Sequence, residues 1–184
     1  MTSQQISKLS AALAAISTAL VAATLLLNVL CWFNPDIAQQ YGLRFGMPEG
    51  AAARWHVDLA SLAGWQLFGA AAISSIPLTA LAAAFWCSRG LFHAFSRGAY
   101  FSEHTAELMS RIARYIALWV GLSLVSEPAL SMWLTATAPA GGHVVSLSLG
   151  SPDLVALYLA GCLAVIAHVL RAGVAVEQEN QQFI

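Results

Sequence analysis

The sequence predicts an all-α, polytopic membrane protein, in which an antiparallel bundle of four transmembrane helices forms a single membrane domain. Of the 184 residues, 59% are hydrophobic and 9% are charged, whereas about a quarter of the residues of a soluble domain are charged. Four stretches are nearly free of Asp, Glu, Lys and Arg, and a helix needs about 20 apolar residues to cross the hydrocarbon. The lipid bilayer is therefore the first expected partner. The formal net charge of -1 provides no basic surface, so we expect no direct contact with nucleic acid.

The four spans are predicted from these uncharged stretches. Three of them give spans at about 9–33, 59–88 and 154–171. The fourth, at about 115–138, is interrupted only by Glu127. A cleaved signal peptide has an apolar core of about 7 to 15 residues, which is shorter than the first stretch. We therefore expect the first stretch to be retained as a transmembrane helix.

The orientation is predicted from the basic residues, which are enriched in cytoplasmic loops. With the N-terminus inside, six basic residues lie on the cytoplasmic side and two on the outer side. The six are Lys8, Arg89, Arg97, Arg111, Arg114 and Arg171, and the two are Arg44 and Arg54. We therefore expect both termini in the cytoplasm, with loops 34–57 and 139–153 outside.

A helical hairpin at about 89–114 is predicted between the second and third spans, on the cytoplasmic side. Helical periodicity continues beyond the second span and breaks at Gly98. Ser102 is then a favourable N-cap for the next helix. Glu107 and Arg111 have the i, i+4 spacing of a helical ion pair.

Small residues at every fourth position are expected to form the helix contacts, because they let helices in a membrane approach closely. Three such ridges occur. They are Ala11, Ala15, Ala19 and Ala23; Ala71, Ser75, Thr79 and Ala83; and Ala156, Ala160, Ala164, His168 and Ala172. They favour a compact, left-handed bundle, in which Pro77 and Pro128 kink the second and third helices.

Glu127 is the main candidate for an intramembrane functional residue. It lies near the middle of its span, where a charged carboxylate costs about 2.5 to 3.5 kcal/mol on insertion scales, so it must be neutral or partnered. The hydroxyl groups expected near its depth are those of Ser74, Ser75, Thr18 and Thr24. His168 is offset by roughly 12 Å along the axis, which argues against a direct pair. Glu127 is either a proton site, a polar ligand contact or a switch at the Pro128 kink, or it is a structural residue. In the structural case it is protonated and bonded to hydroxyls, or its helix breaks early and leaves it at the outer interface.

The remaining reactive side chains predict no catalytic, metal or cofactor site. The sequence has no catalytic or nucleotide-binding motif of the common classes, so we expect no enzyme. Divalent metals need three or four ligands, and the outer side offers at most His56 with Asp58, and His143. His93 and His104 are expected on a solvated face. The cysteines, which are Cys31, Cys87 and Cys162, are expected to be small buried side chains.

Two segments resemble a known family. The stretch Gly98-Ala99-Tyr100-Phe101-Ser102, followed by Leu108, Arg111 and Ile112, and the terminal segment from Glu177 to Ile184 resemble the bacterial inner-membrane family catalogued as domain of unknown function twenty-nine seventy-five. The resemblance extends over most of the chain. It implies a four-span protein of the bacterial inner (cytoplasmic) membrane without known enzyme activity, often encoded beside a small helix-turn-helix regulator.

Three functions are consistent with these features. The first is a regulatory or sensory module that binds a protein partner, such as a cytoplasmic regulator, through the hairpin and a cytoplasmic tail at 172–184. The residues expected to bind that partner are Arg97, Tyr100, Phe101, Arg111, Glu177, Glu179 and Asn180. The second is an accessory subunit of a larger membrane complex, and the third is a small transporter using Glu127. A homo-oligomer stays an open alternative.

Overall fold

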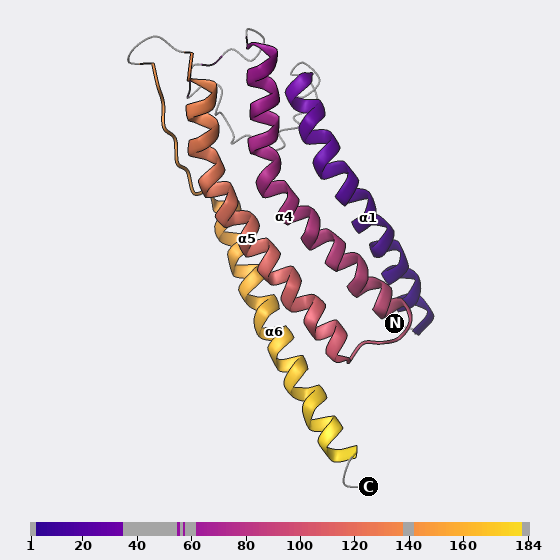
Figure 1. Cartoon of the computed structure of the whole chain (residues 1–184). Helices are drawn as coiled ribbons and strands as arrows, with labels where there is room; N and C mark the ends of the chain where they lie inside the picture. The colour runs from indigo at the N-terminus through magenta and orange to yellow at the C-terminus, as the bar shows by residue number, and fades with distance from the viewer. Residues whose placement is uncertain (1–2, 35–54, 56, 58–61, 138–141, 182–184) are drawn as a thin grey trace.

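The computed structural model describes residues 3–34, 55, 57, 62–137 and 142–181. Within these residues the secondary structure is helical, with no strand. The helices are α1 (Ser3–Phe33), α4 (Gly64–Ser96), α5 (Glu103–Leu134) and α6 (Ser151–Gln181) (Figure 1). Each is long and apolar enough to cross a membrane. The predicted all-α fold with four membrane-spanning helices is therefore confirmed.

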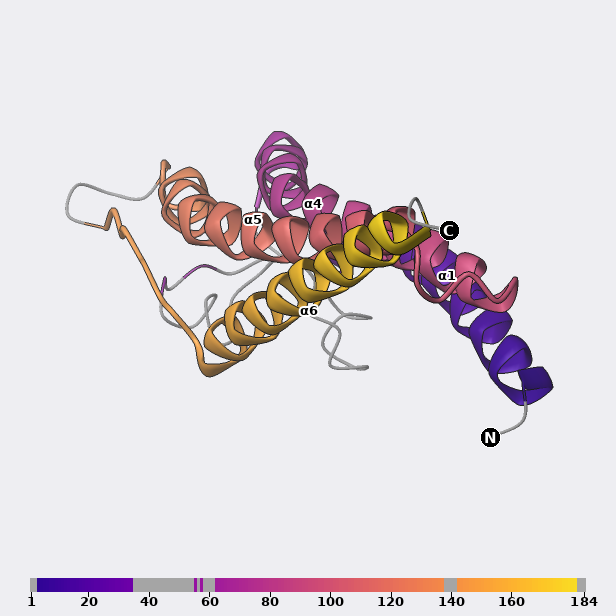
Figure 2. The ribbon, with the colours of Figure 1, turned by 90° about the horizontal axis from the view of Figure 1, so that it is seen from below.

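The helices are arranged in chain order, since α1 packs on α4, α4 on α5, and α5 on α6. In Figure 1, α1, α4 and α5 lie side by side, and Figure 2 shows α6 crossing α5 on the side away from α4. No other pair of helices in the described part of the chain makes more than a marginal contact. The molecule is therefore an open row of helices, which differs from the compact bundle expected from the small-residue ridges.

One end of the molecule, called the arginine end below, carries Arg89, Arg97, Arg111, Arg114 and Arg171. At this end α1 begins, α4 turns into α5, and α6 ends (Figure 1). Gly98 in the turn has a φ of 81°, a conformation that favours glycine. Ser102 caps α5, because its Oγ accepts a hydrogen bond from the Thr105 N–H at 3.2 Å. The predicted helix break and N-cap are confirmed, whereas the cytoplasmic location of this end stays a prediction.

The α1 face that is buried against α4 is mostly polar. Its buried residues are Ser10, Ser17, Thr24, Asn28 and Trp32. The Ser17 and Thr24 hydroxyls donate to carbonyl oxygens four residues earlier, at 2.9 and 2.6 Å, so they need no partner on α4 and still present small side chains to it. The predicted ridge on α1 is wrong, because Ala11, Ala15 and Ala19 are exposed.

The α6 ridge also follows a different period from the one predicted. Ala160 and Ala167 are buried, and Leu163 packs against the cluster of Leu91, Leu108 and Ile112. Ala164, His168 and Ala172 are exposed. The buried positions of α1 recur every seven residues from Ser10 to Thr24 and every four residues from Thr24 to Trp32, and in α6 Ala160 and Ala167 are seven residues apart. A step of seven residues is two turns at the 3.5-residue period of left-handed helix packing.

α4 and α5 are fixed to each other at the end opposite the arginine end. The Trp133 ring lies directly over Gly69, where an added Cβ would be 2.2 Å from a ring carbon. The Trp133 Nε1–H donates to the Gln66 carbonyl oxygen at 3.0 Å. Pro77 and Pro128 lie inside α4 and α5 without ending either helix, and α4 bends about midway along its length (Figure 1).

Candidate functional site

Three polar residues form a ladder along one face of α5, at the end opposite the arginine end. Glu127, Ser131 and Thr135 are spaced four residues apart, so successive side chains are separated by about 6 Å along the helix axis. All three are buried, with exposed fractions of 6%, 0% and 2%. Buried polar groups require hydrogen-bond partners.

Those partners lie in residues 142–150, called the strap below, which run alongside α5 before α6 begins (Figure 1). The Val144 N–H donates to Thr135 Oγ1 at 3.3 Å, and the Ser146 N–H donates to Ser131 Oγ at 3.1 Å. Ser148 continues the series. Its N–H donates to Glu127 Oε2 at 2.9 Å.

The spacing of these bonds has a simple geometric basis. Two residues of extended chain advance about 6.6 Å, which nearly equals the about 6 Å rise of four helical residues. The side chains of α5 therefore accept from every second N–H of the strap, as a neighbouring strand would in a sheet. The Gly150 N–H follows the same alternation and donates to Asp153 Oδ2, in the first turn of α6, at 2.8 Å.

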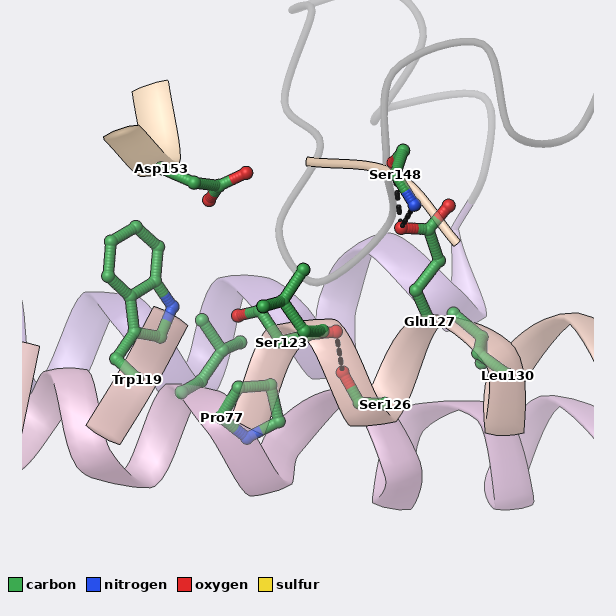
Figure 3. Close-up of a pocket in the computed structure, with 10 residues that line it drawn as sticks. Pro77, Trp119, Ser123, Ser126, Glu127, Leu130, Ser148 and Asp153 are labelled. Carbon is green, nitrogen blue, oxygen red and sulfur yellow. Dashed lines mark hydrogen bonds between the residues drawn. The ribbon is translucent and has the colours of Figure 1, made fainter. Parts of the chain in front are cut away.

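Glu127 receives more hydrogen bonds than the other two ladder residues. Its Oε1 accepts from Ser146 Oγ at 2.8 Å, and its Oε2 accepts from both the N–H and the Oγ of Ser148, the latter at 2.7 Å. Figure 3 shows the carboxylate turned toward Ser148. Glu127 is thus bonded to hydroxyls, as one of the sequence-based interpretations held, but the hydroxyls belong to the strap.

The other face of the strap is apolar. The side chains of Val145, Leu147 and Leu149 point away from α5, with exposed fractions of 67%, 68% and 52%. The strap runs beside the last turns of the apolar stretch of α5, where such side chains are suited to contact with lipid. Its polar side is directed inward and its apolar side outward, the reverse of a surface strand in a soluble protein.

A cavity of about 240 Å³ lies beside Glu127, between α4, α5 and the start of α6. Its polar lining includes Ser123, Ser126, Glu127, Ser148 and Asp153. In Figure 3 Asp153 lies near Trp119, at the other side of the cavity from the Glu127 carboxylate. The two carboxylates therefore line one cavity without meeting. Both have hydrogen-bond donors from the chain itself.

Ser74 and Ser75 belong to a second polar network, which joins α1 to α4. The Asn28 Nδ2–H donates to the Oγ atoms of Ser74 and Ser75, each at 3.0 Å. The Trp32 Nε1–H also donates to Ser74 Oγ, at 2.8 Å. Asn28 is fully buried and was not among the polar residues predicted from the sequence, which were chosen by their depth relative to Glu127. Thr18 and Thr24 bond to carbonyls of their own helix.

The candidate histidines and cysteines do not come together in the described part of the chain, where no three His, Cys, Asp or Glu side chains could hold a metal ion. His168 is exposed on α6. The His143 Nδ1 lies 3.0 Å from the Thr135 carbonyl oxygen. His56 and Asp58 lie outside the described residues, and the three cysteines are partly buried.

Four of the seven residues expected to bind a partner lie at the α4–α5 turn or in the following part of α5, and they are Arg97, Tyr100, Phe101 and Arg111. Arg97 is exposed, and the Tyr100 ring packs on Phe95, with 5.8 Å between the ring centroids. Phe101 is 75% exposed. Arg111 donates from Nε to Glu107 Oε1 at 3.0 Å, which confirms the predicted helical pair.

This hydrogen bond and the charge of Arg111 hold the pKa of Glu107 below its usual value. Glu177, Glu179 and Asn180 lie in the last turns of α6. Their side chains fall outside the description, so the predicted charge contact between the tail and the α4–α5 turn stays a prediction.

Comparison with known proteins identifies one family. The family model described as "Protein of unknown function (DUF2975)" matches residues 42–184, more than three-quarters of the chain. The match includes α4, α5, the strap and α6, and it begins after α1. No curated protein and no solved structure matches the chain. The match over most of the chain and the four apolar helices show that this protein is a multi-pass membrane protein of the DUF2975 family.

Proposed function

We propose that the chain is a non-enzymatic regulatory or sensory module of the bacterial inner membrane, and that its arginine end binds a protein partner in the cytoplasm. The observation that supports this most is Phe101, which is 75% exposed at the α4–α5 turn. The turn lies beyond Arg89 and Arg114, which bound the uncharged stretches of α4 and α5. Phe101 follows Tyr100, whose ring packs on Phe95, and contiguous apolar surface of this kind outside the hydrocarbon marks interaction sites.

The surroundings of Phe101 suit a protein rather than a small ligand. The Phe95 ring packs on both the Phe92 ring and the Tyr100 ring, so an aromatic cluster lies next to Phe101 in the chain. Exposed Arg97 and Arg111 supply positive charge nearby. Aromatic residues and arginine are enriched where protein interfaces have their strongest contacts.

α6 provides a physical link between this surface and the other end of the molecule. Its first turn is bonded to the strap through Asp153 and Gly150, and α5 is the one helix on which it packs extensively. Its 31 residues extend about 46 Å, and its last turns project past the α4–α5 turn (Figure 1). In this proposal, a change in strap docking shifts α6 and alters the surface at the arginine end.

The partner surface can be tested by site-specific photo-crosslinking in intact cells. A photoreactive amino acid at position 101 is compared with one at position 68, because Phe68 is also an exposed aromatic, at 69%, but lies near the start of α4. We expect a discrete protein adduct at position 101 that is absent at position 68. Changing Arg97 and Arg111 to Glu, or deleting Glu177 to Ile184, should abolish this adduct without reducing membrane insertion.

Equal adducts at both positions would instead favour an accessory subunit docked through its membrane faces. Lipid adducts alone at position 101 would contradict a protein partner.

The cavity beside Glu127 supports a second candidate function, that of a small transporter. Glu127 and Asp153 line it together with three serines, a lining that suits a small cation or polar molecule. Uptake that depends on Glu127 and on Asp153, in vesicles containing the purified protein, would favour this function over the regulatory one.

A further inference from the structure

A second hollow, separate from the Glu127 cavity, lies between α5 and α6 at the arginine end. This groove has a volume of about 470 Å³. Its lining side chains carry both signs of charge, and they are Glu103, Glu107, Ser110, Arg114 and Arg171. Neither the proposed partner surface around Phe101 nor the strap uses Arg114 or Arg171.

The groove lies at the depth of the lipid headgroups. Arg114 immediately precedes the uncharged stretch of α5, and Arg171 immediately follows that of α6. Arginine side chains at the ends of spans place their charged groups at the membrane interface. Leu118, one helical turn from Arg114 toward the membrane centre, is 48% exposed. Apolar surface for an acyl chain therefore adjoins the groove on its membrane side.

The two arginines are available to an anionic ligand. Arg111 is engaged with Glu107, whereas Arg114 and Arg171 form no ion pair with any side chain that the structure describes. The planar guanidinium group can bind a phosphate through two parallel hydrogen bonds. Basic pockets between transmembrane helices at the headgroup level are typical sites for lipid headgroups.

The acidic side of the groove restricts the ligand further. Glu103 and Glu107 line the same groove as the two arginines, and Glu107 is already paired with Arg111. The Glu103 carboxylate would repel a headgroup that carries only negative charge, and it would attract an ammonium group. A headgroup with a phosphate and an ammonium a few bonds apart therefore matches the charges of the groove at both sides.

We propose that this groove binds a phospholipid with a phosphoethanolamine headgroup. Arg114 and Arg171 bind the phosphate, the carboxylate of Glu103 faces the ammonium, and the acyl chains lie over Leu118. This inference concerns a different class of ligand from the proposed protein partner, and the two surfaces meet where Glu107 of the groove is paired with Arg111.

The test uses the full chain, purified in detergent and freed of bound lipid. Phosphatidylethanolamine, phosphatidylglycerol or inorganic phosphate is added, and binding is followed by native mass spectrometry and by the shift in Tm. We expect phosphatidylethanolamine to bind most tightly and to raise Tm, and inorganic phosphate to have no effect. Combining Arg114→Gln with Arg171→Gln should weaken phosphatidylethanolamine binding by roughly a hundredfold, about tenfold for each charged hydrogen-bond donor removed.

Two further variants complete the test. Arg97→Gln removes an exposed arginine of the turn that does not line the groove, so it should leave lipid binding unchanged. Glu103→Gln removes the carboxylate that faces the ammonium but keeps both arginines that bind the phosphate. It should therefore reduce the preference for phosphatidylethanolamine over phosphatidylglycerol. The proposal is overturned if the double arginine variant binds phosphatidylethanolamine like the unmodified protein, if phosphatidylglycerol binds equally well to the unmodified protein, or if inorganic phosphate produces the same shift in Tm.

Discussion

Glu127 shows, at the scale of a single residue, how a carboxyl group is accommodated in a membrane span by hydrogen bonds from the chain itself. Its two oxygens accept three hydrogen bonds, all from Ser146 and Ser148. Both oxygens act as acceptors in these bonds, which one N–H and two hydroxyls of the strap donate. The residue therefore holds the strap against α5.

This arrangement predicts that Glu127→Gln is tolerated and that Glu127→Leu is not. A Gln oxygen can replace Oε2, and the Ser146 hydroxyl can rotate to accept from the Gln amide. Leu leaves the Ser148 N–H without an acceptor, at a cost of about 1–3 kcal/mol for each buried donor left unsatisfied. Thermal unfolding in detergent should show a small decrease in Tm for Gln and a large one for Leu. Equal losses for the two variants would indicate instead that the negative charge itself is required.

A Glu127 bonded to hydroxyls was one of the interpretations left open by the sequence, but the hydroxyls expected near its depth were on α1 and α4, whereas its partners lie in the strap. The partners were missed because residues 139–153 were interpreted as an outer loop. The sequence does predict that the strap is extended. Apolar and polar residues alternate from Val145 to Leu149, with the period of two residues that is typical of an extended chain. The usual assumption that polar residues face outward would still have placed the serines on the wrong side.

At the scale of helices, the turn at Gly98 and the cap at Ser102 could be predicted, because each depends on local sequence. The lengths differ from those expected, since α6 extends to Gln181, through most of the predicted tail, and α5 ends at Leu134. The faces along which the helices pack on one another could not be predicted. In α1 the contact residues include Asn28 and two hydroxyl residues that bond to their own helix, and a search for alanine spacing does not detect them. Which face is buried depends on the neighbouring helix, and the sequence of α1 alone does not contain that information.

The contact between α4 and α5 predicts different effects for two glycine substitutions. In Gly69→Ala the new methyl group would overlap the Trp133 ring, so α4 and α5 must separate, and overpacking of this kind costs typically about 1–3 kcal/mol. Gly121→Ala is the matched control, because nothing lies within 4 Å of an added Cβ there. We expect a lower Tm for Gly69→Ala and an unchanged or higher Tm for Gly121→Ala. Similar values for both would mean that Trp133 does not rest on Gly69.

At the scale of the whole molecule, the open row leaves α6 packed on one helix, with the strap at its start and charged residues at its end. This arrangement suits a helix that moves relative to the other three. Whether a shift of α6 would alter a surface inside or outside the cell depends on which end of the molecule faces the cytoplasm. The six-to-two distribution of basic residues predicts that it is the arginine end.

The orientation is tested by labelling single cysteines in intact cells that lack the native ones. A cysteine at Gly142, in the strap, or at Gln40 should react with a membrane-impermeant maleimide. One at Gln4 or Gln182 should react only after the membrane is permeabilised. Labelling of the second pair in intact cells would reverse the orientation, and the partner surface would then face the outside.

The docking of the strap on the α5 ladder is the central claim, and disulfide cross-linking in native membranes tests it most directly. After Cys31, Cys87 and Cys162 are replaced, Ser131→Cys is combined with Ser146→Cys, because the Ser146 N–H lies 3.1 Å from Ser131 Oγ. The control combines Ser131→Cys with Val145→Cys, since Val145 points away from α5 and is 67% exposed. With a mild oxidant, a disulfide is predicted between positions 131 and 146 and not between 131 and 145. Equal cross-linking of the two pairs, or none in either, would contradict a strap docked on α5.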